Sequence, residues 1–247
     1  MFLDLVTLDS FFGEDNSFRV YSIAHLLPLL FFVLMGWIWI NRSKTWTMER
    51  RTKSAFVFSI FLMSLVIFHI LVKVFLGSFE YSKDLPFHLC NLLTFILPLA
   101  IYLKKKWLNG VLYFWILVGT FQALLTPDLK EGFPHFVYFR FWTVHAGLVI
   151  IVLFALARLD WKVEKQHIIY AVLFANVFLA LSIVVNYYSG GNYFYSLKKP
   201  DAATLLDYLG DWPWYLLNGQ FVMLILFCIY YIPMFIMEER RKVNKVN

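Results

Sequence analysis

The chain of 247 residues is strongly apolar, with 61% hydrophobic and only 15% charged residues. Soluble domains usually have about 45–50% apolar and about 25% charged residues, so this chain has too little polar surface for a water-soluble globule. The composition excludes an ordinary soluble enzyme and a disordered chain. The net charge of +6 does not indicate nucleic-acid binding, because the basic residues gather on one side of a predicted membrane protein.

Seven apolar runs of about 17 to 25 residues are long enough to cross a bilayer as helices. They cover residues 20–40, 54–76, 86–103, 108–125, 134–156, 167–188 and 213–237. None shows the strict alternation of a membrane β-strand. We therefore predict an all-α polytopic bundle of seven transmembrane helices.

The basic residues give this bundle an orientation. Fifteen of the 22 Lys and Arg residues lie before the second, fourth and sixth spans and after the seventh. By the positive-inside rule the N-terminus faces outward and the C-terminus faces the cytoplasm. We expect an extracytoplasmic segment (1–19), one transmembrane domain (20–237) and a basic cytoplasmic tail (238–247). The acidic first segment lacks the basic region of a signal peptide, so we expect no cleavage.

Histidines concentrate in the outer halves of the predicted spans. Five of the six lie there, and only His167 is at the cytoplasmic edge. Polar groups in hydrocarbon are costly and usually face the bundle interior or a water-filled cavity. The pattern therefore predicts a polar pocket that opens outward. The alternative is that these side chains only form interhelical hydrogen bonds.

On five spans, polar residues recur at offsets of three, four or seven and so lie on one face of each helix. We expect these polar faces to point toward a common site. The residues are His69 and Lys73; Cys90 and Thr94; Trp115, Gly119, Gln122 and Thr126; His135, Tyr138, Trp142 and His145; and Ser182 and Asn186. The candidate substrate-binding residues are His69, Lys73, His88, Asn91, Gln122, Thr126, Asp128, Tyr138, Arg140, Trp142, Asn186, Tyr193 and Lys199. Lys73 and Arg140, the two cations inside spans, are candidates for binding a lipid phosphate.

The two cysteines differ in their surroundings. Their predicted depths differ by about 15 Å, too far for a disulfide, so both should be free thiols. Cys228 has only apolar neighbours and should pack as a small hydrophobe. Cys90 lies in the first turn of a predicted helix, where the helix dipole favours a thiolate. It is either a reactive thiol or a partly exposed packing residue.

Two outer connections carry further signals. Pro127 and Pro134 stiffen a short loop that would hold Asp128 near His135, to orient that histidine or to cap its own turn. In the longer loop, Asp201 as N-cap and Gly210 as stop predict a short amphipathic helix over the bundle.

Several motifs in spans three to seven resemble one family, the YwaF-type bacterial integral membrane proteins. The motifs are His88-Leu-Cys90, Gln122-Ala-Leu-Leu-Thr-Pro-Asp128, Phe133-Pro-His135, Phe141-Trp with His145, Asn192-Tyr193, Lys199-Pro200 and Trp212-Pro-Trp-Tyr215. The family is similar to a eukaryotic multispanning acyltransferase that builds ether phospholipids with a cysteine and a histidine. It is more distantly similar to membrane hydrolases of fatty-acid esters. The resemblance implies a bacterial cytoplasmic membrane location, Cys90 as nucleophile, and His145, or alternatively His135, as base.

The leading hypothesis is a lipid-directed acyl-transfer or ester-hydrolysing enzyme with a Cys/His site in the outer half of the bilayer. Gln122, Thr126 or Asn91 could stabilise the oxyanion. The alternative is a transporter or binder of a small anionic or lipid-like solute. A zinc hydrolase is a third reading, although H-x-x-x-H spacing is missing. We expect membrane lipid as the partner, no nucleic acid, no metal and no cofactor, and leave the substrate and oligomeric state open.

Overall fold

The computed structural model describes residues 17–201 and 204–246, and the chain is 76% helical. The predicted segment 1–19 therefore lies mostly outside the described residues. The α-helices are α2 (Ile23–Arg42), α3 (Met48–Phe75), α4 (Leu89–Leu103), α5 (Lys106–Phe114), α6 (Phe121–Leu125), α7 (Phe136–Arg158), α8 (Gln166–Ser189) and α9 (Trp214–Val246). Short helical turns are η1 (Ser43–Thr45), η2 (Trp115–Thr120), η3 (Tyr193–Tyr195) and η4 (Leu205–Leu209). The all-α membrane bundle is confirmed.

Six helices are long and apolar enough to cross a membrane: Ile23–Thr45, Met48–Phe75, Lys106–Leu125, Phe136–Arg158, Gln166–Ser189 and Trp214–Arg240. The remaining apolar helix, α4, has 15 residues and begins three residues later than the predicted span at 86. Pro86 and Phe87 are apolar but lie in a turn, so counting apolar residues overestimated this helix. A 15-residue helix spans about 22 Å, less than the roughly 30 Å hydrocarbon core.

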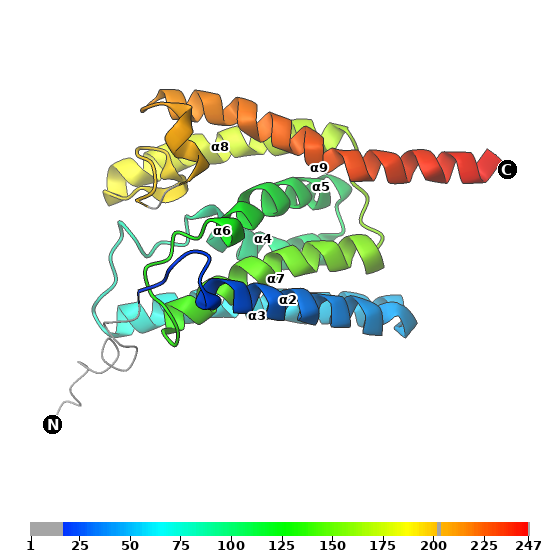
Figure 1. Cartoon of the computed structure of the whole chain (residues 1–247), viewed down its shortest axis with the longest axis horizontal. Coiled ribbons are helices and arrows are strands. Elements are labelled where there is room, and N and C mark those ends of the chain that lie inside the picture. The colour runs from blue at the N-terminus through cyan, green and yellow to red at the C-terminus, as the bar shows by residue number, and fades with distance from the viewer. Residues whose placement is uncertain (1–16, 202–203, 247) are drawn as a thin grey trace.

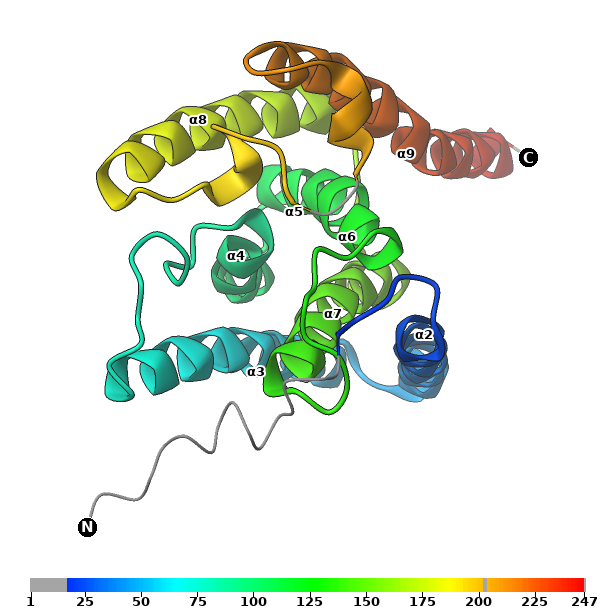
Figure 2. The same ribbon diagram turned by 60° about the vertical axis from the view of Figure 1, so that its left-hand side comes forward.

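The helices form three layers (Figures 1 and 2). On one side, α2 and α3 both pack against α7, and on the other side α8 lies beside α9. Between them lie α4 and the continuous segment α5–η2–α6, which contact α7 and α8 respectively. Gly147 of α7 faces Leu62 of α3 so closely that a Cβ atom would overlap the leucine. Small residues of this kind let membrane helices approach one another.

The segment η2 is a π-helix inside the fourth apolar span. A π-turn inserts extra residues per turn, so side chains that follow it rotate away from the α-helical register. The predicted stripe Trp115, Gly119, Gln122 and Thr126 is therefore wrong. Trp115 Nε1 instead donates to Ala171 O of α8 at 3.0 Å.

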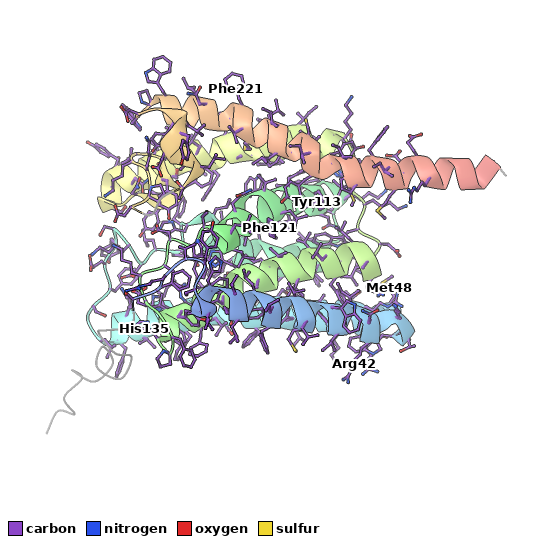
Figure 3. All side chains as sticks on the ribbon, viewed as in Figure 1. Arg42, Met48, Tyr113, Phe121, His135 and Phe221 are labelled. Atoms are coloured by element: carbon purple, nitrogen blue, oxygen red, sulfur yellow. The ribbon has the colours of Figure 1, made fainter. Side chains whose placement is uncertain are left out.

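The two ends of the bundle differ in chemistry. His135 lies at one end, and Arg42 and Met48 lie at the other (Figure 3). The predicted orientation puts the His135 end outside. In the long loop the structure corrects the expected helix: η4 is a 3-10 turn with Thr204, not Asp201, as N-cap residue. The Thr204 N–H donates to Asp207 Oδ2 at 2.7 Å.

Candidate functional site

Cys90 is the second residue of α4 and is half-buried. Its Sγ lies 3.7 Å from the Oγ1 of Thr120, a fully buried residue at the end of η2. Both cysteines are free thiols, as predicted. Sequence reasoning missed Thr120, because an uninterrupted α-helix gives no signal that this side chain turns toward α4.

The N-terminus of α4 has no side-chain cap. His88 is the N-cap, and its ring packs against Tyr193 at 5.0 Å between centroids instead of bonding to the helix. The first intrahelical bond runs from Leu92 N to His88 O, and no described oxygen accepts from the N–H groups of Leu89, Cys90 or Asn91. These three donors lie directly around the Cys90 backbone.

The ring of His145 is held by its own helix. Its Nδ1 is 2.8 Å from Phe141 O, and the two rings stack with centroids 4.1 Å apart. A carbonyl oxygen can only accept a hydrogen bond, so the proton of the neutral ring is on Nδ1. The Nε2 of His145 is then the basic nitrogen. The described structure contains no hydrogen bond between His145 and Cys90.

In two other histidines, His135 and His25, Nδ1 accepts a hydrogen bond instead of donating one. His135 is the N-cap of α7, and its Nδ1 accepts the N–H of Val137 at 3.1 Å. His25 accepts the N–H of Tyr21 at Nδ1 and is bound at Nε2 to Leu124 O, so this buried ring links α2 to α6. Among the described residues, no group of three or more His, Cys, Asp or Glu could hold a metal ion.

Arg140 connects α7 to α4 beneath the outer end of the bundle. Its Nη1 donates to Asn91 Oδ1 over a long 3.5 Å, and its buried Nε has no hydrogen-bond partner. The charge of Arg140 acts on His69, His88 and His145. These three histidines, from α3, the α4 cap and α7, thus lie within electrostatic range of one cation.

Asp128 contacts a tyrosine, and its predicted roles at His135 and in its own turn stay predictions. Tyr195 donates its hydroxyl hydrogen to Asp128 Oδ2 at 2.9 Å, and burial together with this carboxylate raises the pKa of Tyr195. Phe194 and Tyr195 both have positive φ, 58° and 50°, which is unusual for bulky residues. Sequence reasoning missed Tyr195, although it lies two residues after Tyr193.

Several candidate binding residues make bonds that hold the protein together. Asn186 donates to Tyr193 O and Ser196 Oγ and accepts from Tyr193 N. The Tyr193 hydroxyl donates to Tyr81 O and accepts from Leu85 N. Tyr138 donates to Ala24 O at 2.6 Å.

The remaining candidates are also accounted for by local contacts. Lys73 Nζ pairs with Asp84 at 2.8 Å and Lys199 with Asp211 at 3.6 Å. The Thr126 hydroxyl donates to Gln122 O within its own helix. Trp142 is buried beside His25, and its indole N–H has no partner among the described residues. Of the candidates, Asn91 and Arg140 are joined across the α4–α7 contact, whereas Cys90 contacts Thr120 of η2 and His88 packs against Tyr193. The His69 ring stacks on Phe136.

Comparison with known proteins gives the family. The matched stretch of a curated relative, an uncharacterised protein of Treponema pallidum (strain Nichols), is 29% identical over 121 residues, 49% of this chain and 50% of that protein. The match thus spans about half the length of that relative. No solved structure matches the chain with significance. A family model described as the TMEM164 family matches residues 20–231, most of the chain, so the protein belongs to the TMEM164 family of multispanning membrane proteins.

Proposed function

We propose that the protein acts on acyl esters of membrane lipids, by acyl transfer or hydrolysis, with Cys90 as nucleophile and His145 as base. The likeness of the motifs around Cys90, His135 and His145 to YwaF-type proteins supports this proposal, as does the membrane setting of the family. A bundle immersed in lipid meets such a substrate without extracting it from the bilayer.

One observation carries the choice of base. The Phe141 carbonyl places the His145 proton on Nδ1 and leaves Nε2 able to accept a proton. A general base needs this arrangement, in which one ring nitrogen is oriented by a hydrogen bond and the other is basic. His135 has the reverse arrangement at Nδ1, because its Nδ1 caps α7. We therefore favour His145 over His135.

The uncapped start of α4 supplies the second element. No oxygen of the described residues accepts from the N–H groups of Leu89, Cys90 and Asn91, and the oxyanion would form near this end of the nucleophile's helix. Unused backbone donors at such a point stabilise a tetrahedral intermediate. The Thr126 hydroxyl already donates to the Gln122 backbone carbonyl. The side-chain amide of Gln122 remains a second candidate donor.

The chemistry takes two steps. His145 removes the Cys90 proton, the thiolate attacks the ester carbonyl, a C–S bond forms, and the ester C–O bond breaks with the proton returned to the departing alkoxide. An alcohol or water then attacks the thioester, giving a new ester or an acid and regenerating the thiol. Cys90 and His145 are not hydrogen-bonded before substrate binds, and catalytic bonds in unliganded enzymes often tighten only with substrate.

The test uses the purified full chain in vesicles that contain a phospholipid with a labelled acyl chain. We expect release or transfer of the label, and a thioester on Cys90 located by mass spectrometry. Cys90→Ala should abolish both, and His145→Gln should slow them by about 10²–10⁴-fold. Cys228→Ala is the matched control, because that thiol is exposed on α9. Turnover in Cys90→Ala at the wild-type rate would exclude the mechanism.

A second candidate function has one observation in its favour. Arg140 is a cation with an unpaired buried Nε, as found in sites that bind anionic solutes. A binder or transporter of a small anion would need this residue but not Cys90. Uptake of a labelled anion into proteoliposomes that survives Cys90→Ala and stops in Arg140→Gln would favour this function.

A further inference from the structure

The guanidinium of Arg140 has one unused edge. Its Nη1 is engaged with Asn91 Oδ1 at 3.5 Å, whereas Nε is buried and unpaired and no described residue bonds to Nη2. Nε and Nη2 form the side of the fork that binds two oxygens of one phosphate or carboxylate. Asn91 therefore holds one side of the group and leaves the bidentate edge open.

Within residues 17–201 and 204–246, no carboxylate lies within ion-pair distance of this cation. The ion pairs in the described part of the chain do not include Arg140. Asp84 and Glu131 act on it only from beyond ion-pair distance, and Asp84 is already paired with Lys73. The Asp128 carboxylate accepts a hydrogen bond from the Tyr195 hydroxyl. A cation that is mostly removed from water normally has an anionic partner, so the missing partner points to a ligand.

The surroundings of Arg140 also favour negative charge. The imidazoles of His69, His88 and His145, which act on it electrostatically, carry no negative charge, and the carboxylates Asp84 and Glu131 act only from beyond ion-pair distance. Arg140 is the fifth residue of α7, about 6 Å along the helix from its outer end.

We propose that the open edge of Arg140, steadied by Asn91, is a subsite for a phosphoryl oxyanion, supplied by the headgroup of a phospholipid. The inference rests on the proposed function, because Asn91 adjoins Cys90. In a glycerophospholipid the ester carbonyls lie only a few bonds from the phosphate. A phosphate on Arg140 thus directs an ester toward Cys90, and Arg140 determines which lipids are substrates.

Binding is measured in the Cys90→Ala protein, so that the result does not depend on catalysis. The detergent-purified, delipidated full chain is titrated with dihexanoyl phosphatidylcholine, with dihexanoylglycerol, which lacks phosphate, and with inorganic phosphate, and thermal stabilisation is followed. We expect stabilisation by the phospholipid alone. Arg140→Lys should weaken binding about tenfold, since lysine offers a point charge without a fork, and Arg140→Gln should abolish it. Arg158→Gln, at the other end of α7, is the matched control and should bind normally.

A second measurement needs no substitution at Arg140. Phenylglyoxal modification of Arg140, located by mass spectrometry, should slow at least several-fold with the phospholipid and not with the diacylglycerol. Equal binding of both lipids, or full phospholipid binding by Arg140→Gln, overturns the proposal. Stabilisation by inorganic phosphate that depends on Arg140, without a response to phospholipid, supports the oxyanion site and rejects the lipid source. If binding follows these expectations but Cys90→Ala turns lipid over normally, the proposed chemistry fails and the subsite stands.

Discussion

Lys73 Nζ lies 2.8 Å from Asp84 Oδ1, and this ion pair ties the outer end of α3 to the connection that leads into α4. The Asp84 side chain is only 6% exposed, and its Oδ2 accepts the N–H of Glu80. The same carboxylate thus neutralises Lys73 and shapes the turn before α4. Lys73 is therefore a positioning residue for the start of α4, where Cys90 lies.

Loss of this carboxylate should destabilise the protein. Removing one partner of a fully buried pair costs about 3–5 kcal/mol, and the 31% exposure of Lys73 lowers this figure. We expect Asp84→Asn to reduce the free energy of unfolding by about 2 kcal/mol. Denaturant unfolding in detergent checks this value. The control is Lys83→Met, which breaks the exposed pair with Glu80 and should cost less than about 1 kcal/mol. Similar losses in both variants would contradict the role of Asp84.

His135 should behave as a helix cap. Its Nδ1 accepts the N–H of Val137 at the start of α7. Replacing a good N-cap by alanine costs about 1 kcal/mol, whereas asparagine is itself a preferred cap. We expect His135→Ala to lose about this much stability and His135→Asn to lose little, with acyl turnover in the asparagine variant within a few-fold of wild type. If His135→Asn loses turnover as severely as His145→Gln, then His135 is the base.

The sequence predicts the helical class and most helix bounds, because apolar length and flanking charge depend on local composition. It predicts Cys90 at a helix start for the same reason. It does not predict that Thr120 reaches Cys90, since this contact depends on the π-turn in η2. Nor does residue type distinguish His145 from His135. Their roles differ because Nδ1 of His145 bonds to a backbone carbonyl, whereas Nδ1 of His135 accepts a backbone N–H.

The stability of the outer loops should fall in alkaline solution. Burial and the charge of Asp128 raise the pKa of Tyr195 above the ordinary tyrosine value of 10.0. Above about pH 10 the unfolded residue loses its proton while the folded residue keeps it, so rising pH favours unfolding. The stabilisation is complete below that pH and is lost as the pH rises toward the folded-state pKa.

Tyr195→Phe tests this linkage. The variant lacks the ionisable group, so its melting temperature should fall less steeply between about pH 9.5 and 11 than that of the wild type. Differential scanning fluorimetry across this range measures the two slopes. Tyr188→Phe is the control, because Tyr188 is 83% exposed, and its slope should match the wild type. Parallel slopes for Tyr195→Phe and wild type would show that Tyr195 does not contribute.

Asn186 should be the main anchor of the outer loop that carries Tyr195. The side chain is buried, and it makes three hydrogen bonds of 2.7 to 2.9 Å to the turn at Tyr193 and Ser196. Leucine at this position would leave the backbone N–H of Tyr193 without an acceptor, at about 1–3 kcal/mol for a buried unsatisfied group, whereas the Tyr193 carbonyl keeps its longer bonds from Ser196.

We therefore expect Asn186→Leu to lower the free energy of unfolding by about 2–4 kcal/mol. Cys90 should also react faster with a thiol-alkylating reagent, because Tyr195 of the displaced loop packs against His88, the N-cap of the helix that carries Cys90. Asn176→Leu is the matched control on the same helix, since Asn176 is exposed and should change stability by less than about 1 kcal/mol. Equal alkylation rates in Asn186→Leu and wild type would mean that the loop does not cover Cys90, even if the stability falls as expected.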